Sequence, residues 1–218
     1  MGNRGSSGGP ALGNTKDKPV KIISTTDVWS YRHRPDNESF VDEINMGVRN
    51  IQSDFPDIMQ FVKTVSAAEL AGMDRQRVLG FYGQGEVALN QNYTNIDKMN
   101  RVYDAAVSSG YHPGRGDKSG TQAVALHEMG HALTDHIAQK MGITGPAALH
   151  QAAKRIVDAA YRATKGTGGT KAWAGSISGY AQESNAECIA EAVADHYCNG
   201  SNASAASKAI FEQLKKHI

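Results

Sequence analysis

Residues 126–133 read Leu-His-Glu-Met-Gly-His-Ala-Leu and contain the pattern His-Glu-x-x-His. The surrounding apolar residues recur at three- and four-residue spacing, which predicts the buried stripe of a helix. The members of this stripe are Leu126, Met129, Leu133 and Ile137. Ser119 and Gln122 precede the stripe with the spacing of a capping box, and Gly142 is placed to end the helix.

The helical spacing brings the two histidines of this pattern together. Four residues at roughly 100° each place His127 and His131 within about 40° of one another on one helix face. Zinc binds neutral imidazole, and a catalytic zinc site keeps one position open for water, so one further protein ligand is needed. Glu128 points beside such a metal and can take the proton of its water. We therefore expect one Zn²⁺ per chain.

The third ligand distinguishes the classes of zinc hydrolase. A metzincin has Gly and His at the positions where this chain has Thr134 and Ile137. His136 lies about 180° round the helix from His127 and cannot share its ion. No cysteine precedes the motif, which excludes a deformylase-like site. A carboxylate on a later helix remains, and residues 178–192 contain one.

That later segment resembles the gluzincin peptidases, most closely the catalytic-domain family typified by anthrax lethal factor. The family has a His-Glu-x-x-His helix, then a Tyr seven residues before a ligand Glu, which begins a Glu-x-x-Ala-Glu-Ala run. Tyr180, Glu187 and the run from Glu187 to Ala192 match this pattern. The part of the chain that carries the resemblance is residues 78–200.

The resemblance implies a role for three residues. Glu187 is the third metal ligand, Tyr180 stabilises the oxyanion, and Glu191 orients the ligand histidine His127. Each has an alternative interpretation. Ser184 and Glu187 also have the spacing of a capping box, in which the Glu turns back on its own helix. Glu191 can be an exposed helix residue, and Tyr180 can be a packed aromatic residue.

The remaining periodicity predicts an α+β domain over residues 20–218 after a flexible arm at 1–19. A small mixed sheet is expected to pack on the His-Glu-x-x-His helix in a zincin-like fold, with a mostly helical C-terminal half. We expect strands at 20–24, 61–65, 78–82 and 86–90. We expect further helices at 40–55, 95–110, 146–164, 185–198 and 203–216, and a mobile glycine-rich loop at 166–179.

Composition restricts the partners of the chain. The 218 residues include 23 basic and 22 acidic side chains, so no global charge attracts nucleic acid or an acidic membrane. Cys188 and Cys198 are too far apart on one predicted helix to pair, and no apolar run suits a signal peptide or a membrane span. We expect a cytoplasmic protein. The opening, residues 1–10, is similar to the starts of some phage morphogenesis proteins, which suggests association with a virion.

Together these patterns predict a zinc-dependent endopeptidase in which Glu128 activates a water on the metal for attack on the peptide bond of a protein substrate. We expect the substrate to lie along residues 86–90 as an edge strand. The alternatives are a virion-structural or binding protein that retains zinc without turnover, and a hydrolase of another amide. The intact Glu128 argues against the first. The histidines expected at the surface are His112, His150, His196 and His217.

Overall fold

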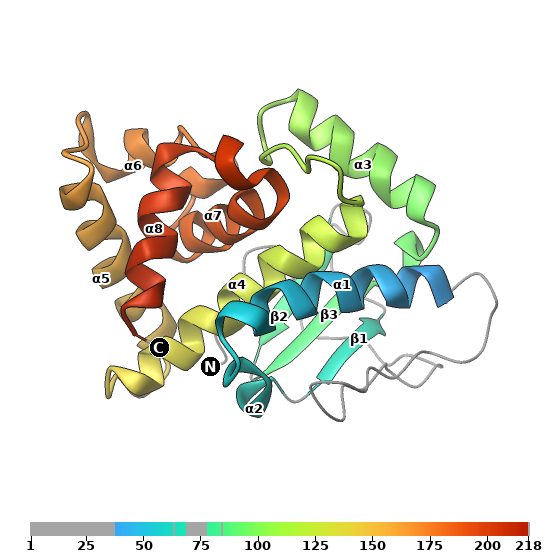
Figure 1. Cartoon of the computed structure of the whole chain (residues 1–218), viewed down its shortest axis with the longest axis horizontal. Helices are drawn as coiled ribbons and strands as arrows, with labels where there is room; N and C mark the ends of the chain where they lie inside the picture. Colours follow the sequence, from blue (N-terminus) through green and yellow to red (C-terminus); the bar gives the residue numbers. More distant parts are fainter. Residues whose placement is uncertain (1–37, 63, 69–77, 84, 218) are drawn as a thin grey trace.

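The computed structural model describes residues 38–62, 64–68, 78–83 and 85–217, which form an α+β fold with a small sheet and a helical C-terminal half (Figure 1). The expected arm at 1–19 and strand at 20–24 lie outside these residues. The helices and strands are α1 (Glu38–Asp54), α2 (Ile58–Phe61), β1 (Thr64–Ala68), β2 (Gly80–Gly83), β3 (Glu86–Asn90), α3 (Ile96–Ser108), α4 (Gly120–Lys140), α5 (Ala148–Ala163), α6 (Gly169–Ala174), α7 (Asn185–Asn199) and α8 (Ala205–Lys215). The predicted fold class is confirmed.

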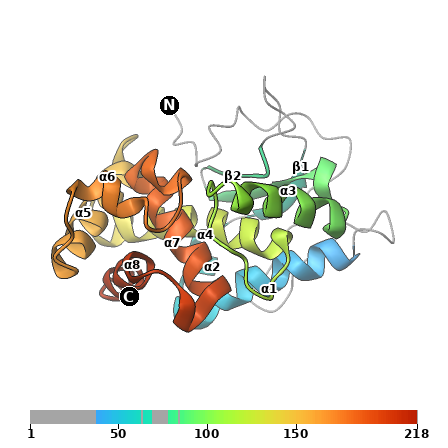
Figure 2. The same ribbon diagram turned by 90° about the horizontal axis from the view of Figure 1, so that it is seen from above.

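Helix α4 runs through the middle of the molecule (Figure 1). It contacts α1, β2 and β3 on one side and α5 and α7 on the other, and the view from above shows the same division (Figure 2). Its predicted apolar stripe is confirmed as buried, yet every residue from Gly120 to Thr134 is buried as well. A helix covered on all sides is a central helix, so the His-Glu-x-x-His motif lies inside the protein.

The start of α4 is fixed by its cap and by α1. Ser119 Oγ accepts a hydrogen bond from Gln122 N at 3.1 Å, as the predicted cap requires. The Gln122 side chain does not turn back to close the box, because its Nε2 donates to Glu43 Oε2 of α1 at 2.5 Å. Ser119 Oγ donates to the same carboxylate oxygen at 2.6 Å. The cap therefore also joins α4 to α1.

The sheet has the strand order β1-β3-β2, with β1 parallel and β2 antiparallel to β3. The strands expected at 78–82 and 86–90 are present as β2 and β3 and pair as a hairpin, with β3 at its expected bounds and Gly85 at a φ of +82° in the turn. The strand expected at 61–65 is misplaced, since Phe61 ends α2 and β1 begins at Thr64. The expectation that β3 is an edge strand is wrong, because β3 pairs on both sides.

The C-terminal half contains the predicted helices as α5, α7 and α8. The glycine-rich segment 166–179 differs from its prediction as a loop without regular structure, because it contains α6. This helix has only six residues, too few for a periodic pattern. Its Trp173 ring meets the edge of the Tyr161 ring on α5, with the centroids 5.8 Å apart. None of the described helices is long and apolar enough to cross a membrane.

Candidate metal centre

Two buried histidines of α4 form the base of the candidate site. His127 and His131 are one turn apart, and their ring centroids lie 5.1 Å from each other with the planes at 79°. Both rings are covered, with 8% and 0% of the side chains exposed. A pair of buried imidazoles on one helix face can bind a single ion.

Glu187 reaches these histidines from the first turn of α7. Its Oε2 lies 3.5 Å from His127 Nε2 and 3.6 Å from His131 Nε2. A tetrahedral zinc site with bonds of about 2.0–2.1 Å separates its ligand atoms by about 3.3–3.4 Å, so the spacing fits. Within the described residues, the buried Glu187 Oε2 has no hydrogen-bond partner. These three side chains can therefore hold a metal ion.

The capping interpretation of Glu187 accounts for its backbone but not for its carboxylate. Ser184 Oγ accepts a hydrogen bond from Glu187 N at 3.1 Å, so Ser184 caps α7. The carboxylate faces the two histidines of α4 instead of returning to its own helix. Burial opposes its ionisation, but the interactions of the carboxylate with His131 and His127 outweigh this effect and lower the pKa of Glu187.

Close packing of α4 on α7 makes this approach possible. A Cβ atom on Gly130 would lie 2.9 Å from Ala190 Cα and 3.2 Å from Val193 Cβ, so any side chain at 130 would separate the helices. Gly130 is one of the two unspecified positions of the His-Glu-x-x-His motif. The close contact places Glu187 and Glu191, one turn apart, beside His127.

Glu191 lies on the far side of the His127 ring from Glu187. Its Oε1 is 2.7 Å from His127 Nδ1, and its Oε2 accepts a hydrogen bond from Ser178 Oγ at 2.7 Å. Burial would raise the pKa of Glu191, but His112 and His127 lower it to about 2. A carboxylate on Nδ1 leaves Nε2 of His127 directed toward Glu187 and His131, where a metal would bind.

The same carboxylates govern the protonation of His127 in the absence of a metal. Burial alone would lower the pKa of His127, whereas Glu187 and Glu191 raise it well above its ordinary value. His131 differs, since burial dominates there and lowers its pKa. A cation at this position therefore replaces a proton that the carboxylates otherwise attract to His127.

Glu128 is buried between α4 and the sheet. Its Oε2 has no hydrogen-bond partner among the described residues. A Cβ on Gly80 of β2 would lie 2.6 Å from Glu128 Oε1, so the strand backbone packs directly on this carboxyl group. Burial, opposed by the charge of His127, raises the pKa of Glu128 to about 8. An acceptor of this kind can take a proton near neutral pH.

Tyr180 lies next to the metal-binding cluster. It begins the 3-10 helix η3 (Tyr180–Gln182), and its ring is parallel to that of His127, with 5.8 Å between centroids and 6° between planes. The Tyr111 ring stacks on Tyr180 at 4.7 Å, and Tyr180 N donates to Tyr111 O at 3.0 Å. The structure thus brings together all six residues that the sequence nominated: His127, Glu128, His131, Tyr180, Glu187 and Glu191.

His112 also belongs to this site, so its predicted surface position is wrong. Its Nδ1 lies 3.0 Å from Glu191 Oε1, and 14% of its side chain is exposed. No sequence signal identifies this contact, because the partner is 79 residues away and on a different element. Of the other histidines expected at the surface, His150 is exposed, whereas His196 and His217 are partly buried.

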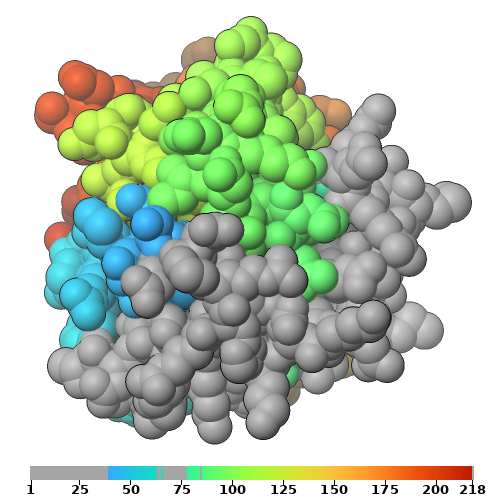
Figure 3. Space-filling model, turned by 90° about the vertical axis from the view of Figure 1, so that its right-hand side faces the viewer, coloured from blue at the N-terminus to red at the C-terminus, as the bar shows by residue number. Residues whose placement is uncertain are grey.

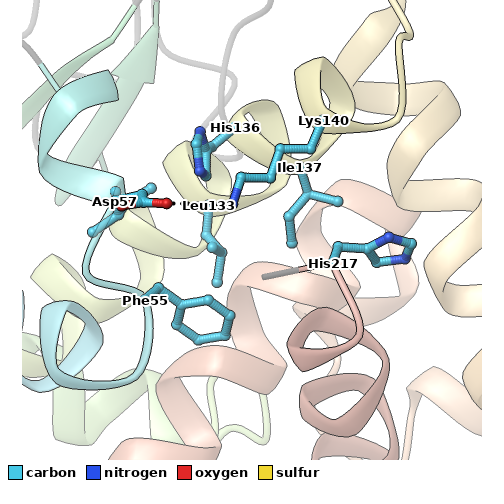
Figure 4. A pocket seen from close by; sticks show the side chains of 8 residues that line it. Phe55, Asp57, Leu133, His136, Ile137, Lys140 and His217 are labelled. Atoms are coloured by element: carbon cyan, nitrogen blue, oxygen red, sulfur yellow. Dashed lines mark ion pairs between the residues drawn. The ribbon is translucent and has the colours of Figure 1, made fainter.

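The opposite face of α4 carries His136, which is remote from the cluster as its spacing predicted. Figure 4 shows His136, Lys140, His217 and Asp57 among the side chains that line a pocket here. Lys140 Nζ lies 3.5 Å from Asp57 Oδ2 across this pocket. Burial is the main cause of the lowered pKa of His136.

Comparisons of the chain with models of protein families, with curated proteins and with solved structures give no match. The His127, His131 and Glu187 cluster is therefore defined by the geometry of the described side chains. The likeness to gluzincins is confined to the motif residues of the sequence.

Proposed function

We propose that the protein is a zinc-dependent peptidase that hydrolyses peptide bonds in a protein or peptide substrate. The observation that carries this proposal is the position of Glu187 Oε2, whose distances to His127 Nε2 and His131 Nε2 each suit a tetrahedral ion, next to the buried carboxyl group of Glu128. Two imidazoles and one carboxylate favour Zn²⁺ over a hard cation such as Mg²⁺.

The protein side chains have separate tasks in this proposal. A zinc ion held by His127, His131 and Glu187 would supply Lewis-acid polarisation of the substrate carbonyl and would lower the pKa of the attacking water. Glu128 accepts the proton of the attacking water and passes it to the leaving amine. Because the charge of the cation favours the carboxylate form, it counteracts the burial that raises the pKa of Glu128.

Tyr180 and Glu191 support the chemistry from either side of His127. The motif resemblance assigns the Tyr180 hydroxyl to the developing oxyanion, and the parallel stacking of Tyr180 on His127 is consistent with this role. Glu191 keeps the Nδ1 side of His127 occupied, which leaves Nε2 for the ion.

Hydrolysis of an unbiased peptide library by the zinc-loaded protein tests the proposal. Glu128→Gln should retain one zinc per chain and the wild-type fold while losing nearly all hydrolysis, because the amide cannot accept the proton. Tyr180→Phe in the same assay should keep zinc and lower kcat by roughly 10² to 10³, the scale of one oxyanion donor.

Three results would contradict the proposal at different points. A folded wild-type protein that binds no zinc would remove the metal centre. Zinc binding without any cleavage would favour a binding protein, and wild-type activity in Glu128→Gln would remove the assigned base. Elemental analysis of the same samples separates the first result from the other two.

A further inference from the structure

The segment after α3 leads from that helix to the candidate site. Gly110 ends α3 in a Schellman motif, in which Gly110 N donates to Val107 O and Tyr111 N donates to Ala106 O, both at 2.9 Å. Gly110 has a φ of +73°, which glycine adopts without strain. After this turn the chain packs back on α3, where Tyr103 Oη donates to Pro113 O at 3.3 Å. Helix α3 itself lies along the outside of the molecule (Figure 3).

Hydrogen bonds fix this segment on both sides of His112. Gly110 O accepts from Gly179 N at 2.8 Å, and the neighbouring Tyr111 carbonyl binds the backbone of η3. After His112, Gly114 O accepts from Asn199 Nδ2 of α7 at 2.7 Å. The backbone that carries His112 is therefore attached to η3 and α7, two of the elements that supply the candidate site beside α4.

Aromatic packing fixes the orientation of the His112 ring. It stacks on Tyr103 of α3 with 5.3 Å between centroids and 5° between planes. The edge of the Tyr111 ring meets it at 5.1 Å. In this orientation His112 Nδ1 lies 3.0 Å from Glu191 Oε1 and 3.2 Å from Oε2, so it spans both carboxylate oxygens.

Three groups surround the Glu191 carboxylate and together determine its plane. Ser178 Oγ donates to Oε2, His127 Nδ1 contacts Oε1, and His112 Nδ1 lies between the two oxygens. The terminal torsion angle of a Glu side chain has a broad distribution, so each contact with the carboxylate restricts the positions that Oε1 can occupy. Because Oε1 is the atom beside His127, loss of the His112 donor would loosen that contact.

We propose that His112 is a positioning residue of the metal centre, which holds Glu191 through Nδ1–H so that Glu191 in turn orients His127 toward the ion. This inference rests on the proposed metal site and adds a residue to it. The competing explanation is that His112 only fills space against Tyr103. The two explanations differ in whether the ring nitrogen or the ring itself matters.

Two substitutions separate the nitrogen from the ring. His112→Phe keeps a ring to stack on Tyr103 but removes the donor, whereas His112→Asn keeps an amide donor near the position of Nδ1 but removes the ring. His196→Phe is the matched control, because His196 also stacks on an aromatic ring, that of Phe211 at 3.6 Å, away from the cluster. Zinc affinity is measured for each folded variant by competition with a chromophoric chelator.

We expect His112→Phe to weaken zinc binding by about tenfold, the lower end for residues that support a metal ligand, and His112→Asn to restore most of this loss. His196→Phe should bind zinc as the wild type does. Wild-type affinity in His112→Phe would overturn the proposal, and so would equal losses in His112→Phe and His112→Asn. A wild-type protein that binds no zinc would instead refute the metal site itself.

The tautomer of His112 tests the proposal without a substitution, which matters if His112→Phe does not fold. Nitrogen-15 spectra of the zinc-loaded wild-type protein distinguish an imidazole protonated at Nδ1 from one protonated only at Nε2. The proposal requires a proton on Nδ1, since Glu191 can only accept there. A ring protonated at Nε2 alone would overturn it.

Discussion

The two ends of α7 hold buried carboxylates in opposite situations. Near its C-terminus, Asp195 accepts hydrogen bonds from Asn199 Nδ2 at 2.8 Å, Ser204 N at 2.9 Å and Ser207 Oγ at 2.6 Å. Near its N-terminus, Glu187 Oε2 has no hydrogen-bond partner among the described residues and faces two imidazoles of α4. A buried carboxylate that already accepts several hydrogen bonds stabilises the fold, whereas a buried carboxylate oxygen without a hydrogen-bond partner is available to a ligand.

The donors of Asp195 are local, which explains its role. All three lie within twelve residues of it along the chain, and together they fix the start of α8 against the end of α7. The groups around Glu187 come from a helix that ends far earlier in the sequence. The comparison therefore predicts that Asp195 contributes to stability and that Glu187 contributes to metal binding.

The largest expected effect is that of Glu187→Gln on zinc binding. Loss of a charged ligand should weaken zinc affinity by at least about 100-fold, more than substitution of a supporting residue. Stability of the metal-free protein should change little, because the amide keeps the shape of the side chain. Chelator competition and chemical unfolding measure the two quantities separately, and unchanged zinc affinity would return Glu187 to the role of a helix-capping residue.

Asp195→Asn is the matched substitution at the other end of α7. It exchanges a charged acceptor for a neutral amide and should lower the free energy of unfolding by about 2 kcal/mol, since hydrogen bonds to charged groups contribute more than neutral ones. Its zinc affinity should equal that of the wild type. A large loss of zinc binding at unchanged stability would show that the two ends of the helix are not separate in function.

The smallest expected effect is that of Gly130→Ala, between the two ends. The added methyl group meets Ala190 Cα at 2.9 Å and should force α4 and α7 apart. Overpacking lowers the free energy of unfolding by about 1–3 kcal/mol, whereas the higher helix propensity of Ala raises it by about 1 kcal/mol. We therefore expect a net decrease of about 1 kcal/mol in the free energy of unfolding. Zinc affinity should fall as well, because Glu187 moves with α7. A more stable variant with full zinc affinity would contradict the close packing.

Much of the fold follows from local patterns. The apolar stripes predict α1, α3, α4, α5, α7 and α8 within two or three residues at most ends, because helix periodicity and caps are properties of neighbouring residues. The failures involve elements whose surroundings decide them. Phe61 lies in α2 and not in a strand, and the six-residue α6 is stabilised by contacts with α5. Short apolar segments do not distinguish these alternatives.

The residues of the candidate site also differ in whether neighbouring residues are enough to predict them. His127, Glu128 and His131 could be predicted as a group because helix geometry alone places them together. Glu187 and Glu191 were nominated through a motif resemblance, since no local rule relates α7 to α4. His112 was missed because its ring reaches Glu191 only through the turn at Gly110 and the packing on Tyr103.

The sequence by itself determined the helices of the α+β domain, the His-Glu-x-x-His helix among them, and the pair of histidines on one face of that helix, because each depends on residues within a few positions of one another. Only the tertiary structure decided that β3 is the central strand and that His112 binds Glu191. It also decided that the carboxylate of Glu187, and not that of Asp195, faces the histidines of α4. These features depend on contacts between distant segments, which form when close packing at Gly130 and burial of apolar side chains bring the helices together.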